Sequence, residues 1–280
     1  MTSTNPRPAA LAGRWYPADP EQLRESVDRY LAEAAIPQIK GQILGLVSPH
    51  AGHIYSGPVA GYSFAAVQGF NPNLVVILAP LHQPEQGALL TTAHEVYRTP
   101  LGEIPVDHHA LDELDELLQV RAGLSLNRIA RDKEHAVEVL LPFLQRSLQE
   151  MPAILPLMLR DQRPETMKAL AGCLADILRG KKPLLIASTD LSHFYSAPEA
   201  EALDRTIIER IIELDPEGIY RVEQQEKGYA CGKGGLAAVI WAAKNLGANQ
   251  AVHLKYSHSG EITGDTSRVV GYEAAALLQK

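Results

Sequence analysis

The sequence predicts a protein of the α/β class, in which one three-layer α/β/α domain spans residues 1–280 around a mixed, largely parallel central sheet. Two observations lead to this prediction. Short apolar runs without polar alternation, which are typical of strands covered on both faces, alternate along the chain with segments of helical periodicity. The composition, with 46% hydrophobic and 21% charged residues, is that of an ordinary globular protein.

The predicted strands are short and rich in aliphatic residues, and they end on proline or polar residues. They cover residues 41–49, 73–80, 153–159 and 183–190. Segment 88–107 has the threonine, valine and tyrosine content of strands and a Pro-Leu-Gly turn, which together indicate a hairpin. This hairpin is the reason for expecting a mixed sheet.

The predicted helices carry apolar residues at helical spacing. They cover residues 20–35, 131–148, 163–180, 198–214 and 234–247. Segment 163–180 has a proline near its start and ends at a glycine, which is the usual asymmetry of helix ends. The tail, 267–280, reads as a strand that passes into a short helical or extended end.

The charge of the chain and its cysteine content indicate which partners it can bind and in which cellular compartment it is found. Lysine and arginine number 26 against 33 aspartate and glutamate residues, for a net charge of −7, so we expect no nucleic-acid partner. Two cysteines do not make a disulfide framework, which favours a reducing cytosol. The first residues lack the apolar core of a secretory signal, and no apolar segment reaches the roughly 20 residues of a membrane span. We therefore expect a soluble, cytoplasmic protein without a membrane partner.

Histidines follow three of the predicted strands. His50 comes after 41–49, His82 after 73–80, and His193, with Asp190, after 183–190. In open α/β sheets, ligands bind beyond the carboxyl ends of the strands. If the strands are parallel, the three imidazoles converge at one edge of the sheet.

Imidazole is the commonest ligand for zinc, copper, iron and nickel, so this convergence indicates a metal site. A metal site usually also has an anionic ligand, and the candidate is Cys231, in the string ACGKGG. A glycine-rich turn enters a helix there, and a helix N-terminus favours the thiolate form that binds metal. The alternative is that Cys231 is a small buried apolar residue.

Further polar residues are candidates for the wall of the pocket. His53 and Tyr55 follow His50 in the string PHAGHIYSG and are expected to shape the site rather than to bind the metal. On a helix, His135 and Glu138 are three residues apart and share a face, which would line the pocket mouth. The alternative for this pair is an ordinary solvated surface.

Motifs along the chain resemble those of the Memo family, whose bacterial and archaeal members are called AmmeMemoRadiSam system protein B. They extend from about Ala12 to about Ala276 and read AGRWYPAD, SPHAGHIYSG, LAPLHQ, YRTPLGEIPVD, EHAVEVLLPFL, ASTDLSHF, ACGKGG and GDTSRVVGY. The resemblance implies a fold similar to that of the class III extradiol dioxygenases and a pocket that resembles a non-haem iron site. It also places His50, His82 and Cys231 at the metal-binding positions.

The resemblance further implies that Asp190 and His193 belong to the motif that supplies an acid/base histidine. One position departs from the pattern, because some relatives carry a second histidine where this sequence has Gln83. The expected cofactor is one transition metal ion. Iron or copper is favoured, and zinc stays open because two imidazoles and a thiolate suit it as well.

We expect a metal-dependent, dioxygenase-like oxidoreductase that acts on a small-molecule or peptide substrate. Under this hypothesis His193 is the general acid or base, and Asp190 sets its tautomer. Two alternatives remain open. One is a non-catalytic binding or adaptor module for a peptide or for a radical-SAM system protein, and the other is a zinc-dependent hydrolase.

Overall fold

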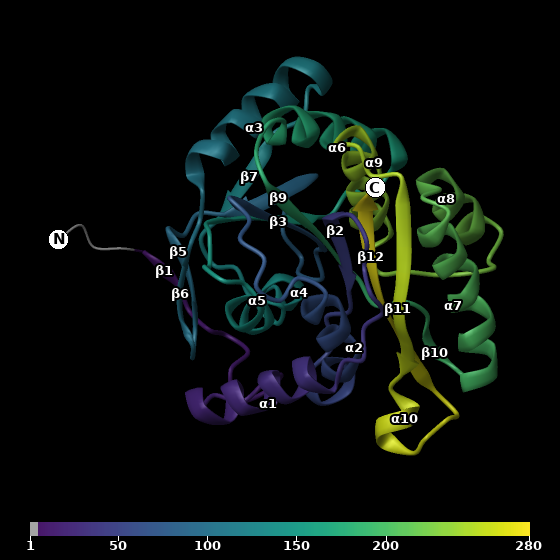
Figure 1. Cartoon of the computed structure of the whole chain (residues 1–280). Helices are drawn as coiled ribbons and strands as arrows, with labels where there is room; N and C mark the ends of the chain where they lie inside the picture. Colours follow the sequence, from purple (N-terminus) through teal and green to yellow (C-terminus); the bar gives the residue numbers. More distant parts are fainter. Residues whose placement is uncertain (1–4) are drawn as a thin grey trace.

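Four parallel strands form the centre of the fold. In spatial order they are β2 (Gln42–Ser48), β9 (Pro183–Ser188), β3 (Leu74–Pro80) and β8 (Ile154–Leu159). Apart from Gln42, every residue of these strands is buried, because helices cover both faces of the sheet (Figure 1). The computed structural model, which describes residues 5–280, thus confirms the predicted α/β class.

Further strands extend the sheet on both sides to nine strands. On one side, β12 (Val269–Gln279) pairs antiparallel with β2 and also with β10 (His193–Tyr195) and β11 (Gln250–His258). On the other side, β4 (Leu89–Thr92) pairs antiparallel with β8, and β7 (Leu126–Ile129) pairs parallel with β4. The sheet is therefore mixed, as predicted, with its parallel strands at the centre.

The segment 88–107 does not form one hairpin. Its first part is β4 of the main sheet, and only β5 (Val96–Thr99) and β6 (Gly102–Pro105) form a hairpin around the Pro-Leu turn. This hairpin belongs to a separate three-stranded sheet, in which β1 (Pro6–Arg7) pairs parallel with β5. The N-terminal segment is thereby tied to the middle of the chain.

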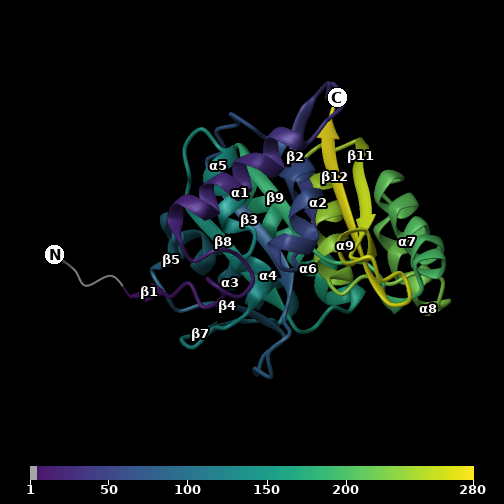
Figure 2. The ribbon, with the colours of Figure 1, turned by 90° about the horizontal axis from the view of Figure 1, so that it is seen from below.

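Helices cover the two faces of the sheet (Figures 1 and 2). One face carries α3 (His108–Ala122), α6 (Pro164–Leu178), α7 (Ala197–Ile212), α8 (Pro216–Gln224) and α9 (Lys233–Asn245). The other carries α1 (Pro20–Glu33), α2 (His53–Ala65), α4 (His135–Glu138) and α5 (Leu141–Ser147), while α10 (Gly260–Thr263) follows β11. No helix within residues 5–280 has both the length and the apolar character required to cross a membrane.

The helices α1, α6, α7 and α9 lie where the sequence predicts helices. Helix α1 begins after Asp19, whose carboxylate accepts hydrogen bonds from the amides of Glu21 and Gln22. Helix α2, in contrast, has no counterpart in the prediction. It crosses α1 so closely that a Cβ atom at Gly61 would lie 2.4 Å from the carbonyl oxygen of Tyr30.

Two predicted segments differ from the structure. Segment 131–148 is not one helix, because α4 ends at Glu138 and α5 starts at Leu141 after a turn. The tail does not become helical, because β12 continues as a strand to Gln279. Its alanine-rich part is fully buried between β2 and β11, and pairing with both strands outweighs the helical propensity of alanine.

Candidate metal centre

The order of the central strands brings three polar segments to one edge of the sheet. Strand β9 lies between β2 and β3, and the three strands are parallel. His50, Asp190 and His82 each lie two residues beyond the end of their strand. These residues therefore meet at neighbouring carboxyl ends, which is where ligands bind in open α/β sheets.

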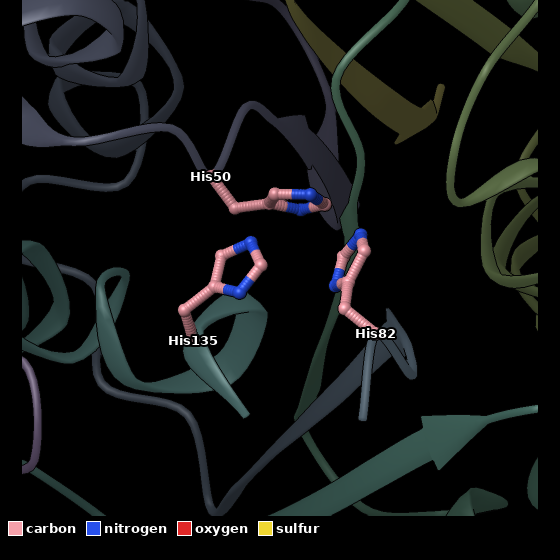
Figure 3. A group of neighbouring side chains, drawn as sticks. All are labelled: His50, His82 and His135. Atoms are coloured by element: carbon pink, nitrogen blue, oxygen red, sulfur yellow. The ribbon is translucent and has the colours of Figure 1, made fainter. Parts of the chain in front are cut away.

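Three imidazoles meet at this edge, and they belong to His50, His82 and His135. One ring nitrogen from each lies within 4.8 Å of the other two. Figure 3 shows the three rings directed toward a common point, with His135 approaching from α4. We call these three residues the histidine group. The sequence predicts His50 and His82 as ligands, but it predicts His135 only for the pocket wall.

A hydrogen bond on the far side of the His50 ring fixes which nitrogen faces the group. Its Nδ1 lies 2.8 Å from Oγ of Ser188, and the Ser188 hydroxyl donates to the carbonyl of Ala136 at 2.6 Å. The Ser188 oxygen is therefore left to accept the Nδ1–H of His50. As a result, Nε2 of His50 carries the lone pair that a metal ion needs.

Glu134 orients the other two histidines. Its Oε1 accepts Nδ1–H of His82 at 2.9 Å, and its Oε2 accepts the backbone amide of His82 at 2.5 Å. Oε1 also accepts the amide of His135 at 2.9 Å and lies 3.1 Å from Nδ1 of that ring. A carboxylate behind the imidazole is typical of metal-binding histidines, because it fixes the tautomer and leaves Nε2 free.

The carboxyl group of Glu134 is ionised although its side chain is fully buried. Burial alone would raise the pKa of Glu134, but the hydrogen bonds and charge of His82 outweigh burial and lower the pKa to about 2. The negative charge is therefore fixed behind the histidine group at neutral pH.

Cys231 lies on the other side of His50. Its Sγ is 3.3 Å from Nε2 of His50 and accepts the backbone amide of Asp190 at 3.2 Å. Gly232 makes this approach possible, because a Cβ atom there would lie 2.5 Å from the carbonyl oxygen of Ser188. Burial, followed by the charge of Asp190, raises the pKa of Cys231 to about 12, so without a metal ion the sulfur is a protonated thiol.

The donors present here fit a transition metal ion. Burial, followed by the charge of His82, lowers the pKa of His50 to about 3, and burial, followed by the charge of His50, lowers that of His135 to about 4. Both rings are thus neutral at pH 7, which is the form that binds metal. Neutral imidazoles suit zinc, copper, iron and nickel, and an adjacent sulfur adds a donor preferred by copper and zinc.

Asp190 and His193 lie beside these donors without belonging to the histidine group. Oδ1 of Asp190 accepts the backbone amide of His50 at 2.7 Å, and burial raises the pKa of this carboxyl group. Nδ1–H of His193 donates to the carbonyl of Leu191 at 2.8 Å and not to Asp190. The tautomer of His193 is therefore set by the backbone, and its Nε2 is left as the basic atom.

Two of the sequence candidates point away from the histidine group. Nε2 of His53 bonds to the carbonyl of Val139 at 2.7 Å, and the ring packs on Phe143. The carboxylate of Glu138 is fully buried, and it accepts hydrogen bonds from Arg7 at 2.5 Å and from the hydroxyl of Tyr16 at 2.6 Å. Both residues hold neighbouring segments in place.

A cavity of about 470 Å³ opens beside the histidine group. Trp15 connects the two, because it lines the cavity and its ring packs against His135 with centroids 4.3 Å apart. Tyr55, a sequence candidate for the wall, also lines the cavity. The remaining side chains that define its character are Phe194, Tyr272, Arg14 and Arg268. The volume is in the usual range for small-molecule sites.

Glu134 and Trp15 belong to the site in the structure but are not among the candidates predicted from the sequence. Glu134 opens the family motif EHAVEVLLPFL, and Trp15 belongs to the motif AGRWYPAD, so the resemblance to the Memo family is the signal that could have pointed to both. Neither motif shows that these side chains meet, because Trp15 reaches His135 only through the course of the N-terminal segment.

Comparisons with known proteins agree over nearly the whole chain. A family model described as "Memo-like protein" matches residues 7–276. A MEMO1 family protein from Nitrosopumilus maritimus is 36% identical over 276 residues, which cover 97% of this chain and 99% of the relative. Proteins of the same description from Methanopyrus kandleri and Methanococcoides burtonii are 34% and 35% identical, over 96% and 98% of this chain and 97% and 100% of the relatives.

Proposed function

This chain belongs to the Memo-like protein family, and we propose that it is a metal-dependent oxidoreductase acting on a small molecule or a peptide side chain. The observation that supports the proposal is the histidine group, with the sulfur of Cys231 beside one of its three rings. His50, His82 and His135 offer imidazole nitrogens within 4.8 Å of one another, and Cys231 offers a sulfur 3.3 Å from Nε2 of His50.

The donor types favour a redox-active ion over a purely structural one. A structural zinc site is usually closed by four protein ligands, whereas a site with three protein ligands keeps a position open for substrate. Three imidazoles form the histidine group here, and Trp15, which packs on the ring of His135, lines a cavity large enough for a substrate. The sulfur of Cys231 adds a soft donor, and the combination of imidazole and thiolate is one that copper uses in redox sites.

We assign separate roles to the bound ion and to the residues around it. Redox chemistry would come from the bound iron or copper ion. His193 would exchange a proton with the substrate through Nε2, because its Nδ1–H is engaged by the carbonyl of Leu191. Asp190 would hold the backbone of His50 in position through the 2.7 Å hydrogen bond to its amide.

The walls of the cavity support a substrate with a flat apolar part. Trp15, Tyr55 and Phe194 contribute aromatic surface. Arg14 and Arg268 are exposed, and neither forms an ion pair with an acidic side chain within residues 5–280. These two guanidinium groups, of which that of Arg268 lies over the ring of Phe194, would attract an anionic substituent on the substrate.

Metal analysis combined with turnover tests the proposal. The protein would be loaded anaerobically with Fe²⁺, Cu²⁺ or Zn²⁺, and bound metal would be measured in the wild type, in Cys231→Ser and in His109→Ala, which changes an exposed histidine. We expect the wild type and His109→Ala to retain about one ion per chain and Cys231→Ser to retain less. Oxygen consumption with small aromatic compounds and peptides would then be compared among the loaded forms.

The outcomes separate the hypotheses. A metal content near zero in the wild type would contradict the proposal. Turnover of esters or amides by the zinc form, without oxygen consumption by the iron or copper forms, would favour a zinc-dependent hydrolase.

A binding role without turnover is a second candidate, because exposed apolar side chains gather at the cavity. Ile54 and Phe194 line the cavity and are 63% and 62% exposed, and Ile262 adjoins the lining residue Thr263. Such surface is typical of a site for a peptide or a protein partner, including the radical-SAM system protein expected from the family resemblance. Pull-down before and after chelation tests this role, since a binding module keeps its partner when the metal is removed.

A further inference from the structure

Arg7 is the largest fully buried side chain of the described residues. Its guanidinium group uses three nitrogens on four acceptors, and one of these is the carbonyl of the adjacent Pro8, 3.3 Å from Nη1. Nε donates to Oδ2 of Asp132 at 2.5 Å, and Nη1 donates to Oε2 of Glu138 at 2.5 Å. Nη2 donates to the backbone carbonyl of Glu134 at 2.7 Å.

The other three contacts enclose the part of the chain that serves the histidine group. Asp132 precedes Glu134 and His135, and Glu138 follows them. Asp132 also accepts the backbone amide of Glu134 at 2.7 Å through its other oxygen. One guanidinium group therefore binds residues on both sides of Glu134 and His135. His135 is a candidate ligand, and the carboxylate of Glu134 lies behind two candidate ligands.

The rest of the N-terminal segment strengthens the same connection. Oε1 of Glu138 accepts the backbone amide of Leu11 at 2.9 Å and the hydroxyl of Tyr16 at 2.6 Å. Trp15 packs on the ring of His135. The segment from Arg7 to Tyr16 is thus attached to 132–138 at several points along its length.

Stability alone does not account for this arrangement. Burying one cation with two carboxylates has a desolvation cost that often equals or exceeds the attraction between them, and apolar replacements of similar volume are frequently as stable. What the planar guanidinium adds is direction, because its fork fixes the acceptors at set angles. Fixed angles matter most at the carbonyl of Glu134, because the next residue in the chain is the candidate ligand His135.

We infer that Arg7 is a positioning residue of the metal centre, which sets the place of Glu134 and His135 and thereby the affinity for the metal ion. This inference rests on the proposed metal binding. It gives the N-terminal segment a role in the site although Arg7 contacts no imidazole of the histidine group.

The test compares two arginine-to-lysine substitutions. Arg7→Lys keeps the charge but loses the fork, and Arg146→Lys makes the same change at an exposed pair, where Nε and Nη2 bond to Asp28 at 2.7 and 2.9 Å. Dissociation constants for Zn²⁺ and Co²⁺ would be measured by competition with a chromophoric chelator, at a temperature where circular dichroism shows both variants folded. We expect Arg7→Lys to bind about 10-fold to 100-fold more weakly than the wild type, as for other residues behind metal ligands. Arg146→Lys should match the wild type.

A second variant covers the case in which Arg7→Lys does not fold. The combination Arg7→Met, Asp132→Asn and Glu138→Gln removes all three buried charges together, so that no carboxylate is left unpaired. It should also lose affinity, because methionine has no donors to replace the guanidinium fork.

A metal-free measurement separates failure of this inference from failure of the proposed function. In ¹⁵N-histidine-labelled protein, the ring signals of His82 and His135 should shift in Arg7→Lys and not in Arg146→Lys. If the wild type binds no metal ion, the proposed function fails, and these signals still decide the role of Arg7. Unchanged ring signals together with an unchanged dissociation constant in the folded Arg7 variants would overturn the inference.

Discussion

Glu134 binds His82 twice, because one carboxylate oxygen accepts the ring Nδ1–H at 2.9 Å and the other accepts the backbone amide at 2.5 Å. The two bonds fix both the tautomer and the rotation of the ring. Glu134→Gln leaves one acceptor and places an NH₂ group against a donor. We expect the affinity for Zn²⁺ to fall about 10-fold to 100-fold. Competition with a chelator measures it, with the exposed Glu103→Gln as control; equal affinities in both variants would contradict the role of Glu134.

Removal of His135 distinguishes a ligand from a wall residue. Since losing a residue behind a ligand costs up to about 100-fold in affinity, losing a ligand itself should cost more than that. We therefore expect His135→Ala to weaken Zn²⁺ binding by more than about 100-fold and to alter the visible spectrum of the Co²⁺ form. The exposed His109→Ala serves as control. If His135→Ala binds Zn²⁺ like the control, His135 is a residue of the pocket wall and not a ligand.

Proton release reports whether Cys231 joins the imidazoles. At pH 7 the rings of His50 and His135 are already neutral, with pKa values of about 3 and about 4, whereas the thiol, with a pKa of about 12, is protonated. Binding through the thiolate should release about one proton per ion. Calorimetry in two buffers of different ionisation enthalpy counts the protons, and the wild type should release about one more than Cys231→Ser. Equal counts in the two proteins would show that the ion is bound through imidazoles only.

Glu273 gives the stability a pH dependence away from the metal centre. Burial raises the pKa of this carboxyl group from its ordinary value of 4.5 to about 7, and a hydrogen bond to His253 opposes the rise. Between these pH values the folded protein holds a proton that the unfolded chain has lost, so stability declines as pH rises. Glu273→Gln should remove up to about 3 kcal/mol of that decline.

Urea unfolding at pH 5 and at pH 8 checks this prediction. The difference in free energy of unfolding between the two pH values should be smaller in Glu273→Gln than in the wild type. Glu116→Gln, an exposed change on α3, should keep the wild-type difference. An identical pH profile for all three proteins would show that Glu273 ionises normally in the folded state.

The central sheet and two of the candidate ligands could be predicted because their signals are local. Each of the four central strands is a continuous apolar run ended by proline or polar residues, and parallel pairing then brings His50 and His82 to the same edge. Helix α1 shows its buried stripe of Leu23, Val27 and Leu31 in the sequence.

Other features depend on contacts between distant segments. Helix α2 is buried on most of its surface, so it has no polar face and no helical periodicity to detect. The pattern of 131–148 fits one continuous helix, whereas in the structure His135 begins the short helix α4 and its amide bonds to the buried carboxylate of Glu134. Arg7 and Glu138 are 131 residues apart in the sequence, and no local pattern pairs them.

The place of β12 in the sheet has a consequence for biosynthesis. Among the described elements it is made last, yet it pairs with β2, one of the first. Until β12 leaves the ribosome, one edge of β2 has no neighbour, and an open strand edge invites association with other nascent chains. His50 extends from that strand, and its neighbour Cys231 is made 181 residues later. A chaperone that shields β2 during translation would therefore raise the yield of folded protein.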